Sequence, residues 1–290
     1  MMRSISRIIL FLFITVIAIL FFAIWRFPED KVANMLERAL EQRLPAFECV
    51  VSPPEIDLPA SLYFKNLHCR QKNTLRELLV EDIRITYTPR RSLTSFSAGL
   101  RFAKGRVKAH LRLLEKNTHL LFETIQLTAI DLTRARSLFA DFDRSVSGSF
   151  FFNGKLRLRT SNFEIIEAGG DLILQDFNME LYKEIFWNRR LLLDELESEL
   201  SLLDGDLFFN EGEMHGPLFS GKFNAVVKDI KNWQNAEIEG YAAINPEQSF
   251  LDTNVEARNQ AQLLYRSLGT PYFPVRVSGT VHDPVIDISL

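Results

Sequence analysis

The sequence predicts a mainly β protein: a single N-terminal transmembrane helix followed by a curved antiparallel β-sheet with a few helices. Three observations support this fold class. An uncharged apolar run occupies Ile8–Trp25, apolar and polar residues alternate through most of the remaining chain, and glycines separate the alternating segments. Alternation with a period of two gives a sheet one apolar and one polar face. Glycines between such segments are typical of the turns of an antiparallel meander.

The apolar run Ile8–Trp25 has eighteen residues, no charge and one hydroxyl, Thr15. As a helix it is about 27 Å long, close to the ~30 Å hydrocarbon thickness of a bilayer. Trp25 lies where an indole would meet the lipid–water boundary. A core helix of a soluble protein and a cleaved signal peptide are the alternatives. The run is longer than a signal-peptide core and lacks a small-x-small cleavage site, so we predict an uncleaved anchor.

The orientation of this anchor does not follow from its flanking charges alone. Two basic residues precede the helix, and four lie in residues 26–45. The tail before the helix has only seven residues, whereas long domains are translocated largely regardless of their charge. We therefore predict a cytoplasmic tail and anchor over residues 1–26. Residues 27–290 form one β-rich domain outside the cytoplasm, with a sub-boundary near 130–148.

Charge is unevenly distributed along the chain. The net charge of −3 gives no reason to expect a nucleic-acid partner. Residues 84–116 carry nine Lys or Arg and one acid, whereas 164–213 carry fourteen acids and three basic residues. In the alternating segment Gly105–Leu113 the polar positions are Arg106, Lys108, His110 and Arg112. We predict a basic interaction face there; the alternative is an ordinary solvated strand face.

Cys49 and Cys69 are the only cysteines. The segments Phe47–Val51 and Ser61–Cys69 flank a proline-rich turn, and pairing them antiparallel brings the two sulfurs together. We predict a disulfide, which an oxidising compartment permits, with two free buried thiols as the alternative. His68 beside Cys69 completes no known zinc pattern, so no metal site is predicted.

Three helices are predicted. The first covers residues 27–43, with Pro28 and two acids in its first turn and Pro45 after its end. The second covers 131–144, with Asp131 as its N-cap, and the third covers 253–268, with Gly269 at C′. Their predicted apolar faces are Val32, Met35, Leu36, Ala39 and Leu40; Leu132, Ala135, Leu138, Phe139 and Phe142; and Val255, Ala257, Ala261, Leu264 and Leu268.

The remaining segments are predicted as strands, including 81–88, the ambiguous stretch 191–203, and a final pair at 275–281 and 285–290. Residues 216–223 match G-x-x-x-x-G-K but end in Phe223, where a phosphate loop needs a hydroxyl for magnesium. We therefore predict a glycine-marked hairpin there. No motif of a catalytic nucleophile or metalloprotease occurs, so neither an enzymatic activity nor a cofactor is predicted.

Phenylalanine occurs 24 times, and many copies lie in predicted strands. One interpretation is ordinary core packing. The other is an apolar groove along one sheet face that holds acyl chains. Its candidate residues are Phe150, Phe152, Phe209 and Phe223.

Several segments resemble a known family when taken in order. They are the anchor, LEQRLP, EIDLPASLYFKNL, IDLTRARSLFADFDRSVSGSFFFNGKLRL, GGDLILQDFNMEL, DELESELSLLDGDLFFNEGEMHGPLFSGKFNAVVKDI and PVRVSGTVHDPVIDISL. Together they resemble the type II secretion system protein N (general secretion pathway protein N) family, which is itself similar to AsmA-like periplasmic proteins. The tail resembles the G-T-x-x-x-P close of AsmA-like domains at Gly279, Thr280 and Pro284.

The resemblance covers nearly the whole chain but consists of glycine and alternation patterns, and it carries over no catalytic residue. It implies a protein of the bacterial inner membrane with a periplasmic β-rich domain. That protein would be a non-enzymatic component of the secretion apparatus, with other secretion-system proteins as partners. The AsmA-like relatives imply an alternative: binding or transport of phospholipid between the membranes and a role in outer-membrane biogenesis.

Overall fold

The computed structural model describes residues 28–43, 45–57, 60–72, 77–89, 94–114, 118–136, 144–160, 164–185, 188–230, 235–270, 272–281 and 283–288. The predicted anchor Ile8–Trp25 lies outside these residues. No helix among the described residues is long and apolar enough to cross a membrane. The chain divides into two compact units, Met1–Arg84 and Ile85–Leu290. The predicted sub-boundary at 130–148 lies within the second unit.

The first unit contains helix α2 (Glu29–Arg43) and the strands β1 (Phe47–Val51), β2 (Glu55–Asp57), β3 (Ser61–Gln71) and most of β4 (Glu77–Tyr87). Strands β1 and β2 both pair antiparallel with β3. The predicted helix over 27–43 is confirmed, but its buried face differs from the prediction. Of the predicted face, Val32, Leu36 and Leu40 are half-buried, whereas Met35 is 66% exposed and Ala39 is exposed. Ala33, which was not predicted, is buried.

Glu37 also lies on the side of α2 that faces β1. Its carboxylate accepts a hydrogen bond of 2.9 Å from the backbone N–H of Val51 on β1. Successive N–H groups of a strand point to opposite edges. Because the N–H of Ser52 donates to Asn66 on β3, the N–H of Val51 points to the edge of β1 that faces away from β3. Helix α2 therefore covers the edge of β1 with the side that carries Ala33 and Glu37. A covered edge strand cannot pair with another chain.

Cys49 and Cys69 are joined by a disulfide in the structure. The two residues lie directly opposite each other on β1 and β3, as the predicted strand pairing requires. Hydrogen-bonded and non-hydrogen-bonded pairs alternate along an antiparallel ladder. Ala46–Lys72 and Ser52–Asn66 are hydrogen-bonded pairs, so Cys49–Cys69 is a non-hydrogen-bonded pair. Opposite residues approach most closely at such positions, and the two Cα atoms are 4.0 Å apart.

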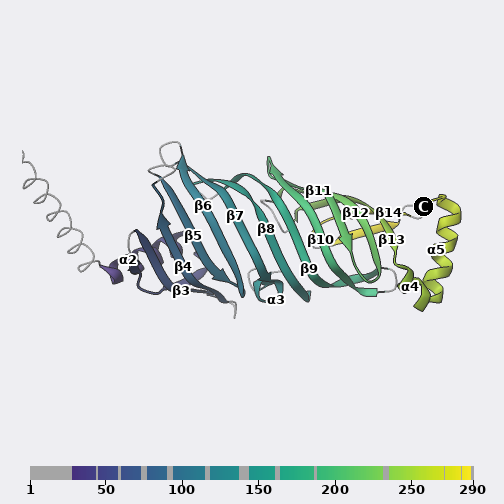
Figure 1. The fold of residues 1–290 in the computed structure, drawn as a ribbon, viewed down its shortest axis with the longest axis horizontal. Helices are drawn as coiled ribbons and strands as arrows, with labels where there is room; N and C mark the ends of the chain where they lie inside the picture. Colours follow the sequence, from purple (N-terminus) through teal and green to yellow (C-terminus); the bar gives the residue numbers. More distant parts are fainter. Residues whose placement is uncertain are drawn as a thin grey trace, which may run out of the picture. The chain divides into compact units, whose positions relative to one another are not determined.

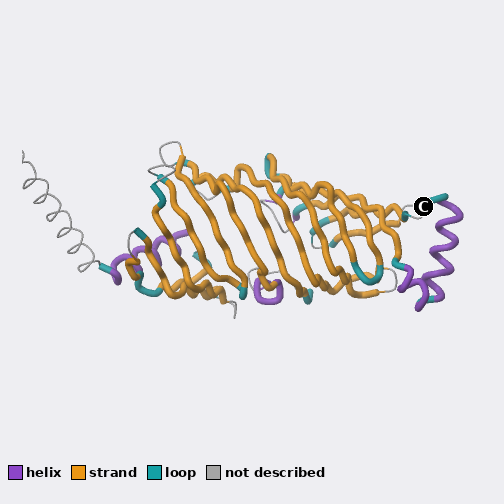
Figure 2. Tube along the Cα trace, viewed as in Figure 1, coloured by secondary structure: helices purple, strands orange, loops and turns teal. Residues whose placement is uncertain are grey.

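The second unit is an antiparallel sheet in which β5 to β15 are hydrogen-bonded neighbours in chain order. The strands are β5 (Ser95–Phe102), β6 (Gly105–Leu114), β7 (His119–Asp131), β8 (Val146–Arg159), β9 (Ile165–Ile185), β10 (Asn188–Leu203), β11 (Asp206–His215), β12 (Phe219–Lys228), β13 (Glu237–Pro246), β14 (Phe273–Gly279) and β15 (Pro284–Ile288). Figure 1 shows β5 to β10 side by side, and Figure 2 shows how little of this unit is helical. The predicted antiparallel, mainly β fold is confirmed, and 191–203 is a strand.

Two kinds of irregularity shape this sheet. Hairpins turn at Ala103–Lys104 and Asp204–Gly205, where both residues of each pair have positive φ, as a two-residue type I′ turn requires. Bulges interrupt the register of β6–β7, β7–β8, β8–β9, β10–β11 and β11–β12. Bulges bend strands and increase their twist, which accounts for the curvature of the sheet.

Of the two helices predicted in the second unit, the first is described as far as Arg136 and the second is divided in two. Helix α3 (Leu132–Ala135) has the predicted N-cap, since Asp131 accepts hydrogen bonds from the N–H groups of Thr133 and Arg134. Leu138, Phe139 and Phe142 lie outside the described residues. The third predicted helix is two helices, α4 (Gln248–Thr253) and α5 (Val255–Leu268), and Gly269 ends α5 with a φ of 66°.

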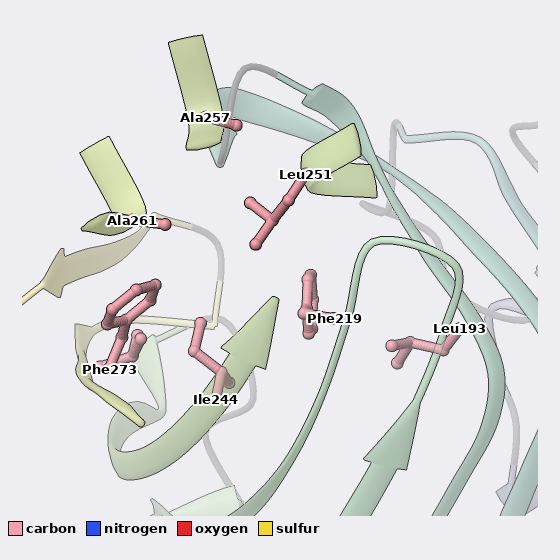
Figure 3. Close-up of a cluster of buried hydrophobic side chains, with 8 residues drawn as sticks. Leu193, Phe219, Ile244, Leu251, Ala257, Ala261 and Phe273 are labelled. Atoms are coloured by element: carbon pink, nitrogen blue, oxygen red, sulfur yellow. The ribbon is translucent and has the colours of Figure 1, made fainter. Parts of the chain in front are cut away.

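The helices α4 and α5 cover one end of the sheet. Leu251, Ala257 and Ala261 pack with residues from β10 and β12–β14 in the cluster shown in Figure 3. Val255 does not belong to this face as predicted, because it is 65% exposed. Asn254 is the N-cap of α5, which places Val255 in the first turn beside the exposed Glu256. The core of the second unit is therefore concentrated under α4 and α5.

Candidate functional site

One face of the sheet in the second unit is apolar from β5 to β14. Directly opposite residues of an antiparallel pair point to the same face, so the register can be followed across the sheet. One such row consists of Ala98, Ala109, Ile125, Gly154, Gly170, Leu200, Phe209, Ala225, Gly240 and Val277. The row contains no polar side chain. We call the face that carries it the apolar face.

The next row, one residue away, has the opposite chemistry. It consists of Gly99, Lys108, Gln126, Asn153, Asp171, Glu199 and Asn210. A shift of one residue along a strand reverses the face, so these side chains lie on the other side of the sheet. We call it the polar face. The sheet is therefore amphipathic across its strands, as the alternation in the sequence predicts.

The four candidate phenylalanines all lie on the apolar face. Phe152 is opposite Leu172, and Phe150 is opposite Leu174. Phe209 is opposite Leu200, and Phe223 is opposite Gly212. All four keep part of their surface accessible, unlike the closely packed residues under α4 and α5. These four rings are therefore partly accessible on the apolar face.

Glycines on the apolar face make room for two of these rings. A Cβ atom at Gly154 would lie 2.6 Å from Cζ of Phe152, and one at Gly212 would lie 2.4 Å from Cε1 of Phe223. Both distances are shorter than any real contact, so each ring occupies the space over a glycine. The missing side chains of Gly154 and Gly212 therefore leave space that the two rings fill. Sequence reasoning identified the rings but missed the glycines under them.

The predicted basic residues lie together on the polar face of β6. Arg106, Lys108 and His110 are exposed. Arg112 forms an ion pair of 3.4 Å with Glu123 on β7. Arg101 on β5 is directly opposite Arg106 and adds a further positive charge. This group forms a basic region of the polar face.

Acidic residues collect on the same face at β9–β11. Asp171 is directly opposite Glu199, and Glu197 is directly opposite Glu213. Glu213 is also opposite Lys222 on β12, and their side chains form an ion pair of 2.7 Å. The Lys222 hydrogen bond and charge lower the pKa of Glu213, and Glu213 raises the pKa of Lys222. The uneven charge of the sequence thus corresponds to basic residues at β5–β6 and acidic residues at β9–β11 on the same face of the sheet.

A hollow of about 620 Å³ lies between these two regions on the polar face. Gly169 is among its lining residues, and a Cβ atom there would meet nothing closer than 3.4 Å. Lys155 lies directly opposite Gly169 on β8, and Asp171 and Glu199 also line the hollow. Positive and negative groups therefore both line this hollow.

The described residues contain no group of three or more His, Cys, Asp or Glu side chains that would hold a metal ion. The turn after β11 contains Gly216 and leads directly into β12, so 216–223 is a strand hairpin as predicted. Glu195, Glu197 and Glu199 alternate along β10 on the polar face. His215 on β11 lies directly opposite Glu195, and Glu213 lies directly opposite Glu197.

Comparisons with family models, with curated proteins and with solved structures found no match for this chain.

Proposed function

We propose that the second unit binds acyl chains of phospholipids along its apolar face, in a protein that Ile8–Trp25 anchors in a membrane. The observation that carries this proposal is the apolar row from Ala98 to Val277, which runs through ten neighbouring strands. Each methylene group that such a surface removes from water contributes about 0.8 kcal/mol. No catalytic or metal-binding role is proposed.

The dimensions of the apolar face support an acyl chain as the ligand. Neighbouring strands are about 4.8 Å apart, so a path across ten strands is about 43 Å long. One leaflet of a bilayer core is about 15 Å thick, which sets the approximate length of an extended lipid tail. The path is therefore long enough for a tail to move along it. The phenylalanine rings over Gly154 and Gly212 would contact the tail along their flat sides.

Two consecutive phenylalanines provide a matched test. Phe152 lies on the apolar face, whereas Phe151 is opposite Ile173 on the polar face, and both are partly buried. The full chain, extracted gently from membranes, is expected to carry phospholipid in native mass spectrometry. Phe152→Gln should lower the lipid-bound fraction, and Phe151→Gln should leave it near that of the wild type. Absence of lipid from the wild type, or equal losses in both variants, would contradict the proposal.

The separated charges of the polar face support a second proposal, that of a non-enzymatic component of a bacterial secretion apparatus. Rows of like charge on one face favour protein partners with complementary surfaces. A pull-down from membranes is expected to recover other secretion components. Reversal of Arg106 and Lys108 to Glu should weaken that recovery. Normal secretion in a deletion strain, together with an empty pull-down, would refute this role.

A further inference from the structure

Helix α2 has a second face that the sheet does not use. Ala33 and Glu37 face β1, and the opposite side of the helix carries Lys31, Asn34, Met35, Arg38, Ala39 and Gln42, all exposed. These six residues also line a hollow of about 510 Å³. We call this side the outer face of α2.

The composition of the outer face suits an anionic lipid surface. It carries two positive charges, Lys31 and Arg38, and no acid; Asp30 and Glu41 lie at its margins by helical geometry. Met35 between them is 66% exposed, which leaves an apolar side chain in water unless something covers it. A basic face with a central apolar residue binds at the boundary between lipid headgroups and acyl chains.

The position of α2 in the sequence identifies the occupant. Only three residues separate Trp25, the end of the apolar run, from Glu29, the first residue of α2. Three residues span about 10 Å at most, so a chain anchored through Ile8–Trp25 keeps α2 within reach of the headgroups. We propose that the outer face of α2 lies on the anionic membrane surface, with Lys31 and Arg38 contacting lipid phosphates and Met35 entering the interface.

In the sequence alone, the polar residues of α2 mix Glu37 and Glu41 with Arg38 and Arg43, a composition that disfavours a membrane surface. In the structure Glu37 is bound to the N–H of Val51, so its charge is turned toward β1. The remaining outer face is basic. Helix α2 would thus lie between the membrane surface and the edge of β1.

The inference rests on the proposed anchor and is tested with the full chain. Because Cys49 and Cys69 are paired, a cysteine introduced at Met35 is the only free thiol for a fluorescent label. The labelled protein is reconstituted in vesicles of equal parts phosphatidylcholine and phosphatidylglycerol that carry a headgroup nitroxide quencher. A label at Val50, which is 60% exposed on β1, is the control. We expect a large loss of fluorescence at Met35 and a small loss at Val50.

Charge reversal separates surface binding from simple proximity to the anchor. Lys31→Glu combined with Arg38→Glu should reduce the quenching at Met35, whereas Lys65→Glu with Arg70→Glu, an equal change of charge on exposed residues of β3, should not. The inference would be overturned if reversal at Lys31 and Arg38 left the quenching unchanged. It would also be overturned if a protein partner shielded the label at Met35 from both lipid and water-soluble quenchers.

A carbonate wash of the same vesicles reports on the anchor separately. A chain that is retained, but whose Met35 label is quenched no more than the Val50 label, refutes the surface contact and leaves the anchor intact. A chain that is washed off refutes the anchor and this inference together. A retained chain with strong, charge-dependent quenching supports both.

Discussion

At the scale of single residues, the disulfide is the feature of the first unit with the largest expected effect on stability. The disulfide closes a loop with a sequence separation of 20. The loss of chain entropy in the unfolded state is expected to stabilise the folded state by about 3 kcal/mol. Cys49→Ser and Cys69→Ser should each lower the melting temperature of this unit, and the double variant should be no worse than either single variant. Thermal denaturation with and without reductant measures the effect. Insensitivity of the wild type to reductant would contradict it.

A second residue-scale prediction concerns glycines that the strand geometry requires. A Cβ atom at Gly154 would lie 2.3 Å from the carbonyl oxygen of Gly169, which is backbone and cannot move aside. Gly154→Ala should therefore cost about 1–3 kcal/mol of unfolding free energy. At Gly99 the nearest atom is 4.0 Å away, so Gly99→Ala should be neutral or stabilise by about 0.5 kcal/mol. Chemical denaturation of the two variants decides; equal effects would disprove the steric explanation.

At the scale of elements, the ion pair between β11 and β12 predicts a dependence on pH. The hydrogen bond and charge of Lys222 lower the pKa of Glu213 in the folded state. A lowered carboxyl pKa contributes stability above the unfolded pKa, and that contribution is lost as the pH falls through the folded value. Lys222→Gln should raise the pKa of Glu213 toward its ordinary value, measured by NMR titration of the carboxyl carbon. Lys228→Gln, which removes the partner of Glu239, should leave Glu213 unchanged.

The strands were predictable from the sequence because a period of two fixes which side of a sheet each residue takes. The four phenylalanines of the apolar face and the four basic residues of the polar face follow directly from this alternation. Helix α2 shows where the same reasoning fails. Val32, Met35, Leu36, Ala39 and Leu40 have helical spacing, but Met35 and Ala39 are exposed. Glu37 instead faces β1, where its partner is a backbone N–H on another element. A long-range hydrogen bond of this kind leaves no periodic signal.

The glycines under Phe152 and Phe223 illustrate another limit. In the sequence Gly154 and Gly212 read as turn signals, because glycine usually separates strands. In the structure both lie inside strands, β8 and β11, where their missing side chains make room for rings. Which ring lies over which glycine depends on strand register and bulges. For Phe223 and Gly212 that register joins residues of two different strands.

At the scale of the whole molecule, the anchor and the disulfide make a joint prediction about location. A disulfide forms and persists in an oxidising compartment and is rare in the cytosol. If Ile8–Trp25 exports the chain from residue 27 onward, Cys49 and Cys69 should be oxidised in cells that express the full chain. A variant that lacks residues 1–26 should stay in the cytosol with both thiols reduced. Alkylation of lysates after denaturation without reductant should therefore modify two cysteines only in the truncated variant. In the full chain, Leu12→Arg combined with Ile17→Arg should have the same effect as the truncation, because two charges in the apolar run make membrane insertion costly. Equal alkylation of the full-length and truncated proteins would contradict export through this segment.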